Sequence, residues 1–230
     1  RPPISTLFPY TTLFRSAPIV KATGALLCVD CVSCMAGVEI KVDEWGIDVA
    51  LASVQKCFAV PPGLALCSIS TAALEKAKTV PNRGSYLDFI EIQSKGAKSN
   101  EHPVTPPTPQ MRALLAAVKK INNEVGAAKY WADQAERTKK IHDWAKANGF
   151  EMYSPEGNHS KTVATIKNTI KMDVGKFVDG LFKRGFKIVN GYGKTKDLAF
   201  RIAAMGWITK QETENMLNAA SEALKEAKTA

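Results

Sequence analysis

The sequence predicts an α/β fold, with a mainly parallel sheet in the first half of the chain and a small α+β domain at the carboxy-terminal end. Three short apolar runs, 25–30, 47–53 and 64–69, are joined by short connections, as in the buried sheet of an α/β domain. After residue 149 the order becomes strand, helix, strand, strand, helix. The chain has 230 residues, 45% of them hydrophobic, which is enough to bury a sizeable core.

Local signals set the elements of the first half. Asp30 ends the first apolar run, and Pro61-Pro62-Gly63 predicts a rigid turn before the third. Ser70 is a good cap for a short helix over 71–78. Residues 82–101 are polar and irregular, so we expect mostly loop there.

Helical spacing dominates the middle of the chain. Thr108 followed by Pro109 begins a helix whose apolar residues recur on one face up to Ile121. Gly126 breaks it, and a second helix runs to about Asn148. Beyond that point we expect strands at 162–167, 186–189 and 199–202, and helices at 174–184 and 212–227.

Three segments are expected along the chain. Residues 1–16 have no initiator Met and no clean strand or helix periodicity, and we interpret them as a non-native leader. Residues 17–125 are predicted to form part of a large domain, and residues 126–230 the small carboxy-terminal domain.

Composition excludes several classes of function. The net charge is +9, but Lys and Arg are spread from Lys21 to Lys228, mostly between acids, which indicates a solvated surface and no nucleic-acid partner. No stretch approaches the roughly 20 apolar residues of a membrane span. The odd number of cysteines, five, suits a reducing compartment, so we expect a cytoplasmic protein.

Three of the cysteines form a C-x-x-C-x-x-C string, Cys28, Cys31 and Cys34. Such a string could hold an iron–sulfur cluster. We favour packing instead, because Cys28 lies within the apolar run ALLCV and behaves there as a small buried hydrophobe. Cys57 and Cys67 fall in other predicted elements, so no fourth ligand is at hand. We predict no metal site.

Two candidate catalytic residues end two neighbouring predicted strands. Asp30 closes the first strand, and Lys56 follows the second in SVQKCFAVPPG. Each alone is more simply a turn acid or a surface lysine. Ligands of open α/β sheets bind beyond the carboxyl ends of strands. Pyridoxal phosphate needs a lysine for its imine and a carboxylate at its pyridine nitrogen, and burial would favour the neutral amine that an imine requires.

A third candidate is Arg201 in LAFRIAAMG, on a predicted strand of the second domain. Its simplest role is a surface cation. Its functional role would be to bind a substrate carboxylate through two parallel hydrogen bonds, which lysine cannot reproduce.

Four ordered motifs resemble one enzyme family. VDCVSCMAG, DEWGIDVALASVQKCFAVPPGLAL, TPPTPQMRAL and VNGYGKTKDLAFRIAAMG are similar to class V aminotransferases, above all to the alanine–glyoxylate / serine–pyruvate group, from Ala17 to the end. The resemblance implies part of a fold-type I large domain, a homodimer with active sites at the subunit interface, and pyridoxal 5'-phosphate. It implies transfer of an amino group from a small amino acid to a 2-oxo acid, glyoxylate or pyruvate.

The same resemblance assigns the catalytic and substrate roles. Lys56 is the Schiff-base lysine, forming an aldimine with the cofactor, and also the base that moves the substrate proton. Asp30 pairs with the pyridine nitrogen, and Arg201 binds the substrate carboxylate.

Further cofactor contacts and departures follow from the family pattern. Val32 packs on one face of the ring, Gln55 lies beside the phosphate, and Thr105 reaches the phosphate of the partner subunit. Val54 stands where the family has Ser, and His102 where an aromatic Tyr is common. The family's glycine-rich phosphate loop and ring-stacking aromatic lie upstream, and neither is visible before Ala17, so the sequence resembles an amino-terminally truncated member.

Two alternatives stay open. A cysteine desulfurase-like lyase of the same superfamily would have His before the lysine and a Cys in a mobile loop, whereas here Gln55 precedes Lys56 and no Cys follows Cys67. The chain could also be an inactive fragment that lacks the upstream half of the cofactor site.

Overall fold

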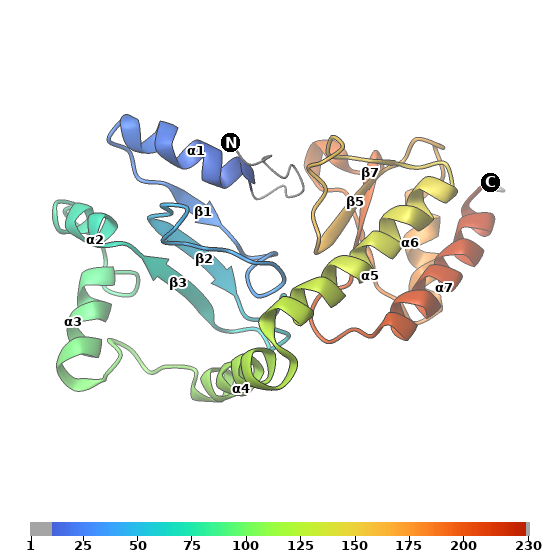
Figure 1. The fold of residues 1–230 in the computed structure, drawn as a ribbon. Coiled ribbons are helices and arrows are strands. Elements are labelled where there is room, and N and C mark those ends of the chain that lie inside the picture. The colour runs from blue at the N-terminus through green and yellow to red at the C-terminus, as the bar shows by residue number, and fades with distance from the viewer. Residues whose placement is uncertain (1–10, 229–230) are drawn as a thin grey trace. The chain divides into compact units, whose positions relative to one another are not determined.

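The computed structural model describes residues 11–228. Contacts along the chain divide them into two compact units (Figure 1). The amino-terminal unit comprises residues 11–35 and 40–120, and the carboxy-terminal unit comprises residues 36–39 and 121–228. Within the described part of the chain, no helix combines the length and the apolar character needed to cross a bilayer.

The amino-terminal unit is built on a sheet in the order β1-β2-β3. The strands are β1 (Cys28–Asp30), β2 (Val49–Ser53) and β3 (Ala65–Ile69), which confirms the three expected strands. β1 and β2 are parallel, as expected, but β3 runs antiparallel to β2. The connection over 54–64 explains this difference, because it is shorter than the dozen or so residues that a parallel crossover requires.

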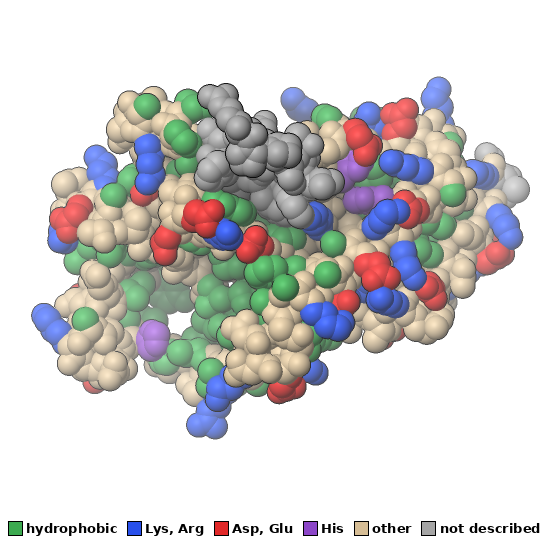
Figure 2. Space-filling view, viewed as in Figure 1, with side chains coloured by type: hydrophobic (Ala, Val, Ile, Leu, Met, Phe, Trp, Pro, Cys, Tyr) green, Lys and Arg blue, Asp and Glu red, His purple; other side chains and the backbone are tan. Residues whose placement is uncertain are grey.

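One face of this sheet is open. The strand register places Cys28, Asp30, Leu51 and Cys67 on the same side, and Leu51 is 41% exposed. Apolar atoms are visible between α3, α4 and the sheet in Figure 2. The expectation that β1 and β3 are buried, with Cys28 packed inside, is therefore wrong. An apolar run shows that its side chains are hydrophobic but not that a second layer covers both faces. Only the opposite face, which carries the fully buried Ala50, belongs to the core.

Helix α1 (Thr11–Ala22) begins inside the segment for which no regular structure was expected. Its Ala17 is buried, and it packs against the turn at Gly46. A methyl group added to Gly46 would lie 3.8 Å from the Ala17 side chain and 3.1 Å from that of Lys21. Tertiary packing on this turn stabilises α1. The sequence pattern of residues 1–16 alone did not predict a helix there. The remainder of the expected leader, residues 1–10, lies outside the described residues.

Helix α2 (Thr71–Lys78) confirms the expected short helix, because the Ser70 hydroxyl accepts a hydrogen bond from the Ala73 N–H. Helix α3 (Phe89–Ser99) overturns the expected loop at 82–101. Asp88 caps α3 by accepting from the Ile90 N–H at 3.0 Å. The helix buries no residue completely, and its large apolar residues lie together at its start, so the Asp88 cap was the clearer sequence signal.

The two long helices of the middle segment break where expected. Helix α4 (Thr108–Lys119) continues into a π-helical turn, η1 (Lys120–Val125). Gly126 then adopts a φ of 86°, a left-handed conformation that favours glycine, and α5 (Ala127–Ala147) starts directly after it.

The carboxy-terminal unit has an antiparallel sheet in the order β4-β5-β7-β6. β4 (Glu151–Met152) was not expected, and β6 (Val189–Asn190) is shorter and later than the strand predicted at 186–189. The strands and helices that match the expectations are β5 (Val163–Lys167), β7 (Ala199–Ala203), α6 (Val174–Lys183) and α7 (Lys210–Lys228).

Helices α5, α6 and α7 supply one hydrophobic core against a single face of this sheet. Phe177 of α6 and Phe200 of β7 are fully buried and meet edge to face at 5.2 Å. Side chains alternate along β7, so the neighbouring Arg201 points to the opposite face, where Thr165 and Val189 lie beside it. The chain therefore places its candidate arginine on the face of the sheet that the helices leave open.

Candidate functional site

Asp30 lies at the carboxyl end of β1, in an exposed position. Its Oδ1 accepts a hydrogen bond of 2.8 Å from the Val32 N–H, which turns the chain away from the sheet. The Cys31 N–H donates to the Leu51 carbonyl at 2.8 Å, so the strand pairing continues up to this turn. The carboxylate is thus held at a fixed place on the edge of the sheet.

Lys56 lies in a tight turn that follows β2. Its N–H donates to the Ser53 carbonyl at 3.5 Å, and its carbonyl accepts from the Ala59 N–H at 2.9 Å. Ala59 adopts a φ of 56°, unusual for a residue other than glycine, so the turn holds a strained backbone. Lys56 is half-buried, and within the described residues its amine forms no hydrogen bond or ion pair.

The turns after β1 and β2 contact each other. The Cys57 thiol, next to Lys56, donates to the Ser33 carbonyl at 3.5 Å. Since β1 and β2 are parallel, their carboxyl ends meet at one edge of the sheet, and Asp30 and Lys56 both follow from that edge. In the described part of the chain the two do not form an ion pair. An unpaired carboxylate and amine at one edge suit the pyridine nitrogen and the aldehyde of pyridoxal phosphate.

The other residues expected at the cofactor surround this edge. Val32 is half-buried in the turn after β1. Gln55 is exposed, and its side-chain oxygen accepts a hydrogen bond from the Ser53 hydroxyl. Val54 is fully buried, so its side chain belongs to the core of the unit, and an apolar residue suits that place.

Two thiols of unequal acidity lie beside Val32. Cys31 is fully buried and Cys34 is partly exposed. A hydrogen bond between their side chains lowers the pKa of Cys31 and raises the pKa of Cys34, and burial raises the pKa of Cys34 further.

Thr105 belongs to the same unit as Lys56, in a proline-rich segment before α4. It is exposed. The start of α4 is tied to the turn after Lys56, because the Gln110 side-chain amide donates to the Pro62 carbonyl at 3.4 Å.

Arg201 lies on β7 of the carboxy-terminal unit. Its guanidinium carbon lies 4.2 Å from the centroid of the Tyr192 ring. Its Nε is buried and has no hydrogen-bond partner. By contrast, Arg137 donates to backbone carbonyls and Arg184 pairs with Glu226. Within the described residues, Arg201 is thus a half-buried cation whose donors have no protein acceptor.

Sequence reasoning missed two residues that shape these regions. Tyr192 over Arg201 was one, and the Gly-Tyr-Gly pattern around it was the available signal. Asp48 was the other. It is buried, and its carboxylate accepts from the Leu27 N–H and from the Ser70 hydroxyl, each at 2.9 Å. Asp48 therefore joins the entry to β1, the start of β2 and the cap of α2.

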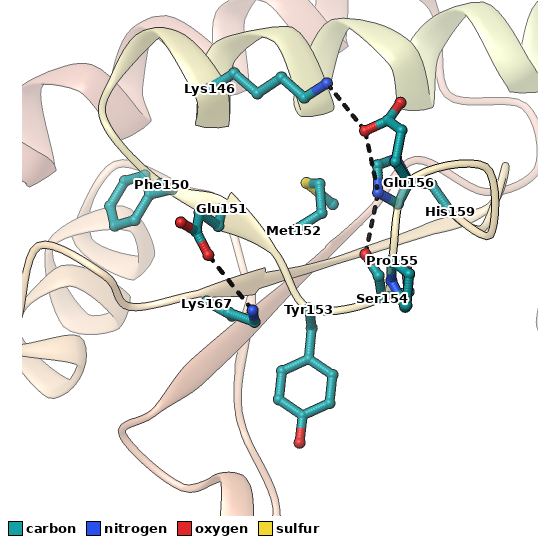
Figure 3. A pocket seen from close by; sticks show the side chains of 10 residues that line it. All are labelled: Lys146, Phe150, Glu151, Met152, Tyr153, Ser154, Pro155, Glu156, His159 and Lys167. Atoms are coloured by element: carbon teal, nitrogen blue, oxygen red, sulfur yellow. Dashed lines mark hydrogen bonds and ion pairs between the residues drawn. The ribbon is translucent and has the colours of Figure 1, made fainter.

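A separate cavity of about 340 Å³ lies in the carboxy-terminal unit, beneath the end of α5 (Figure 3). Two ion pairs border it, Lys146 with Glu156 at 3.6 Å and Lys167 with Glu151 at 3.4 Å. The charges compensate each other, and none of the predicted site residues lines the cavity. It is not the candidate site.

Comparisons with known proteins identify related sequences and folds. The family model described as aminotransferase class-V matches residues 11–191. An uncharacterized aminotransferase of Methanocaldococcus jannaschii is 32% identical over 90% of this chain and 54% of its own length. The L-aspartate–glyoxylate aminotransferase of Paracoccus denitrificans is 29% identical over 80% of this chain and 47% of its own length.

The structural comparison covers most of the chain. The crystal structure of pyridoxamine–pyruvate aminotransferase from Mesorhizobium loti superposes with a TM-score of 0.86 at 24% identity, covering 94% of this chain and 56% of that one. The chain spans about half the length of the curated relatives it matches.

Proposed function

Because the chain belongs to the class V aminotransferase family, we propose that it transfers the amino group of a small amino acid to glyoxylate or pyruvate, with pyridoxal 5'-phosphate as cofactor. The expected fold-type I architecture is confirmed for the part of the fold that the chain covers. Two relatives bear names that match the proposed reaction, L-aspartate–glyoxylate aminotransferase and pyridoxamine–pyruvate transaminase.

The observation that supports the proposal is the shared carboxyl edge of β1 and β2, which Asp30 and Lys56 both follow without forming an ion pair with each other. Pyridoxal phosphate supplies an electron sink for the carbanion that forms at the substrate Cα. In this proposal the Lys56 Nζ would hold the cofactor covalently. Once the substrate amine has displaced it, the freed Lys56 amine would move the proton from the substrate Cα to C4′ of the cofactor. The Asp30 carboxylate keeps a proton on the pyridine nitrogen, because a negative charge beside that nitrogen favours its protonated form.

The neighbouring residues orient the cofactor in this proposal. Val32 packs against one face of the ring, supported by the half-buried position of its side chain. Gln55 contacts the phosphate, and its exposure beside the turn leaves it accessible for that contact. Thr105, exposed on its proline-rich segment, would reach the phosphate held by a partner subunit, which makes the proposed assembly a homodimer.

Arg201 is the proposed carboxylate-binding residue. Its donors have no acceptor in the described residues, and a guanidinium can bind a carboxylate with two parallel hydrogen bonds. Such an arginine selects an α-carboxylate without choosing the substrate side chain, which leaves alanine, serine or aspartate as donors. We propose a cytoplasmic location because all five cysteines are free thiols, as in a reducing compartment.

Absorbance tests the proposal. Incubating the purified chain with pyridoxal phosphate should give the visible band of a lysine-bound cofactor, which should shift when alanine is added. Lys56→Ala should remove the band. Lys76→Ala, at an exposed position on α2, is the matched control and should retain it.

Each other outcome has a defined meaning. A band that survives in Lys56→Ala would show that another lysine binds the cofactor and would refute the assignment. Sulfide release from cysteine without a 2-oxo acid would favour a desulfurase-like lyase. If the band is absent from this chain but present in a version extended upstream to the length of its relatives, this piece alone lacks a complete cofactor site.

A further inference from the structure

We propose that Tyr192 is a positioning residue that holds the Arg201 guanidinium ready for the carboxylate of a small 2-oxo acid. The inference rests on the proposed function and extends it to a residue outside the predicted site. Within the carboxy-terminal unit, the Arg201 guanidinium carbon lies 4.2 Å from the centroid of the Tyr192 ring.

This contact is the interaction that orients Arg201. Among the described residues, no carboxylate or carbonyl accepts a hydrogen bond from its guanidinium. An arginine side chain has several rotatable bonds, and without a partner it would sample many directions. The electron-rich face of an aromatic ring attracts the cation and so limits the directions that it samples. Because Tyr192 already restricts the Arg201 side chain, less side-chain entropy is lost when Arg201 binds a carboxylate.

The loop that carries Tyr192 is rigidly built. The Tyr192 N–H donates to the Thr195 Oγ1 at 3.0 Å, and that hydroxyl donates back to the Tyr192 carbonyl at 2.8 Å. The Asn190 side-chain amide donates to Asp197 at 2.7 Å across the base of the loop. Gly191 donates its N–H to the Ala199 carbonyl at 2.8 Å. The backbone of Tyr192 is thus fixed although the residue as a whole is 68% exposed.

In the described part of the chain the Arg201 Nε lacks a hydrogen-bond acceptor, which indicates the kind of ligand that Arg201 and Tyr192 would bind. This N–H is buried, yet no described residue accepts from it, which is unfavourable unless a ligand supplies an acceptor. The N–H groups of a guanidinium lie in its plane, so a carboxylate accepts from them along that plane. In that plane one carboxylate oxygen would accept from Nε and the other from a terminal nitrogen, as in a bidentate pair. Neighbouring Thr165 and Val189 carry no charge that would compete for it.

The test measures pyruvate binding at Arg201 directly. In the ¹⁵N-labelled full chain, the Arg201 Nε–H resonance is identified by its loss in Arg201→Lys, and pyruvate is titrated. Tyr192→Leu should weaken pyruvate binding about two- to fivefold, the range of a cation–π contact at an exposed site, whereas Tyr192→Phe, which keeps a ring, should bind pyruvate about as the wild type does. Without pyruvate, the Arg201 resonance should shift in Tyr192→Leu because the ring current is lost.

Tyr86→Leu is the matched control, since Tyr86 is 70% exposed against 68% for Tyr192, and it should bind pyruvate as the wild type does. The unchanged resonances of Arg137 and Arg184 would show that each variant is folded. Equal affinity in wild type and Tyr192→Leu, equal losses in the Phe and Leu variants, or no response of Arg201 to pyruvate would each overturn the proposal. The Lys56 absorbance band reports the proposed function separately, and Tyr192→Leu should leave it unchanged.

Discussion

Replacing Gly191 by alanine should destabilise the loop that carries Tyr192. A methyl group built on Gly191 would lie 2.0 Å from the Thr195 carbonyl oxygen and 2.9 Å from that of Ala199. Both obstacles are backbone atoms, so no side-chain rotation can relieve the overlap. The loop must open, and the pairing of Tyr192 with Thr195 is the first part to separate.

The magnitude follows from what opening the loop removes. The Thr195 N–H donates to the Tyr192 carbonyl at 3.0 Å, and the Tyr192 N–H donates to the Thr195 hydroxyl at 3.0 Å. Each such bond contributes about 1 kcal/mol net. Residual overpacking typically costs about 1–3 kcal/mol. We therefore expect Gly191→Ala to lower the free energy of unfolding by about 3–5 kcal/mol and the melting temperature by on the order of 10 °C.

Thermal unfolding followed by tryptophan fluorescence measures this effect, because Trp131, Trp144 and Trp207 all belong to the carboxy-terminal unit. Gly96→Ala is the control. Gly96 lies in helix α3 with open space around it, so the same substitution should raise stability there, by about 0.5–1 kcal/mol. A Gly191→Ala variant as stable as the wild type, with the Arg201 resonance unmoved, would refute the close-packed loop.

Two further predictions concern stability in acid and a buried carboxylate. Burial and the neighbouring His159 lower the pKa of His142 from 6.5 to about 4, so between these values the unfolded chain binds a proton that the folded chain does not. Stability should therefore fall as the pH falls through this window, and His142→Phe should show a smaller fall in urea unfolding, unlike His102→Gln at an exposed position. Asp48→Ala leaves two donors without their acceptor and should cost about 2–4 kcal/mol in urea unfolding followed at Trp45, with Asp48→Asn costing less.

Sequence reasoning identified the strand ends because their signals are local. Asp30 and Lys56 each follow an apolar run, and the parallel pairing of β1 and β2 then brings them to one edge. The antiparallel direction of β3 was accessible too, from the length of residues 54–64, but the expectation of a mainly parallel sheet overrode it. Helix α3 was missed because its large apolar residues, Phe89, Ile90 and Ile92, lie together at its start and the rest of it is polar or small.

Other features depend on tertiary contacts that no local pattern encodes. Helix α1 is held by the turn at Gly46, far from it in sequence. Tyr192 reaches Arg201 only because the loop between β6 and β7 folds back over the strand. Whether an apolar strand such as β3 is covered is decided by the layers around it and not by its own residues.

The ion pairs of the chain strengthen the interpretation of the candidate residues. Oppositely charged side chains elsewhere in the chain form ion pairs. Arg83 pairs with the α3 cap Asp88 at 2.9 Å, and Arg184 of α6 pairs with Glu226 of α7. Asp30 and Lys56 follow adjacent strands whose turns are joined by a thiol–carbonyl contact, yet within the described residues they form no ion pair with each other. A carboxylate and an amine kept apart at one sheet edge contribute little to folding, since surface ion pairs are worth at most about 1 kcal/mol and an unformed one nothing. In the proposed site, the pyridoxal phosphate ring would lie between them, with its pyridine nitrogen at the carboxylate and its aldehyde at the amine. Loss of the cofactor band in Lys56→Ala is therefore the decisive measurement.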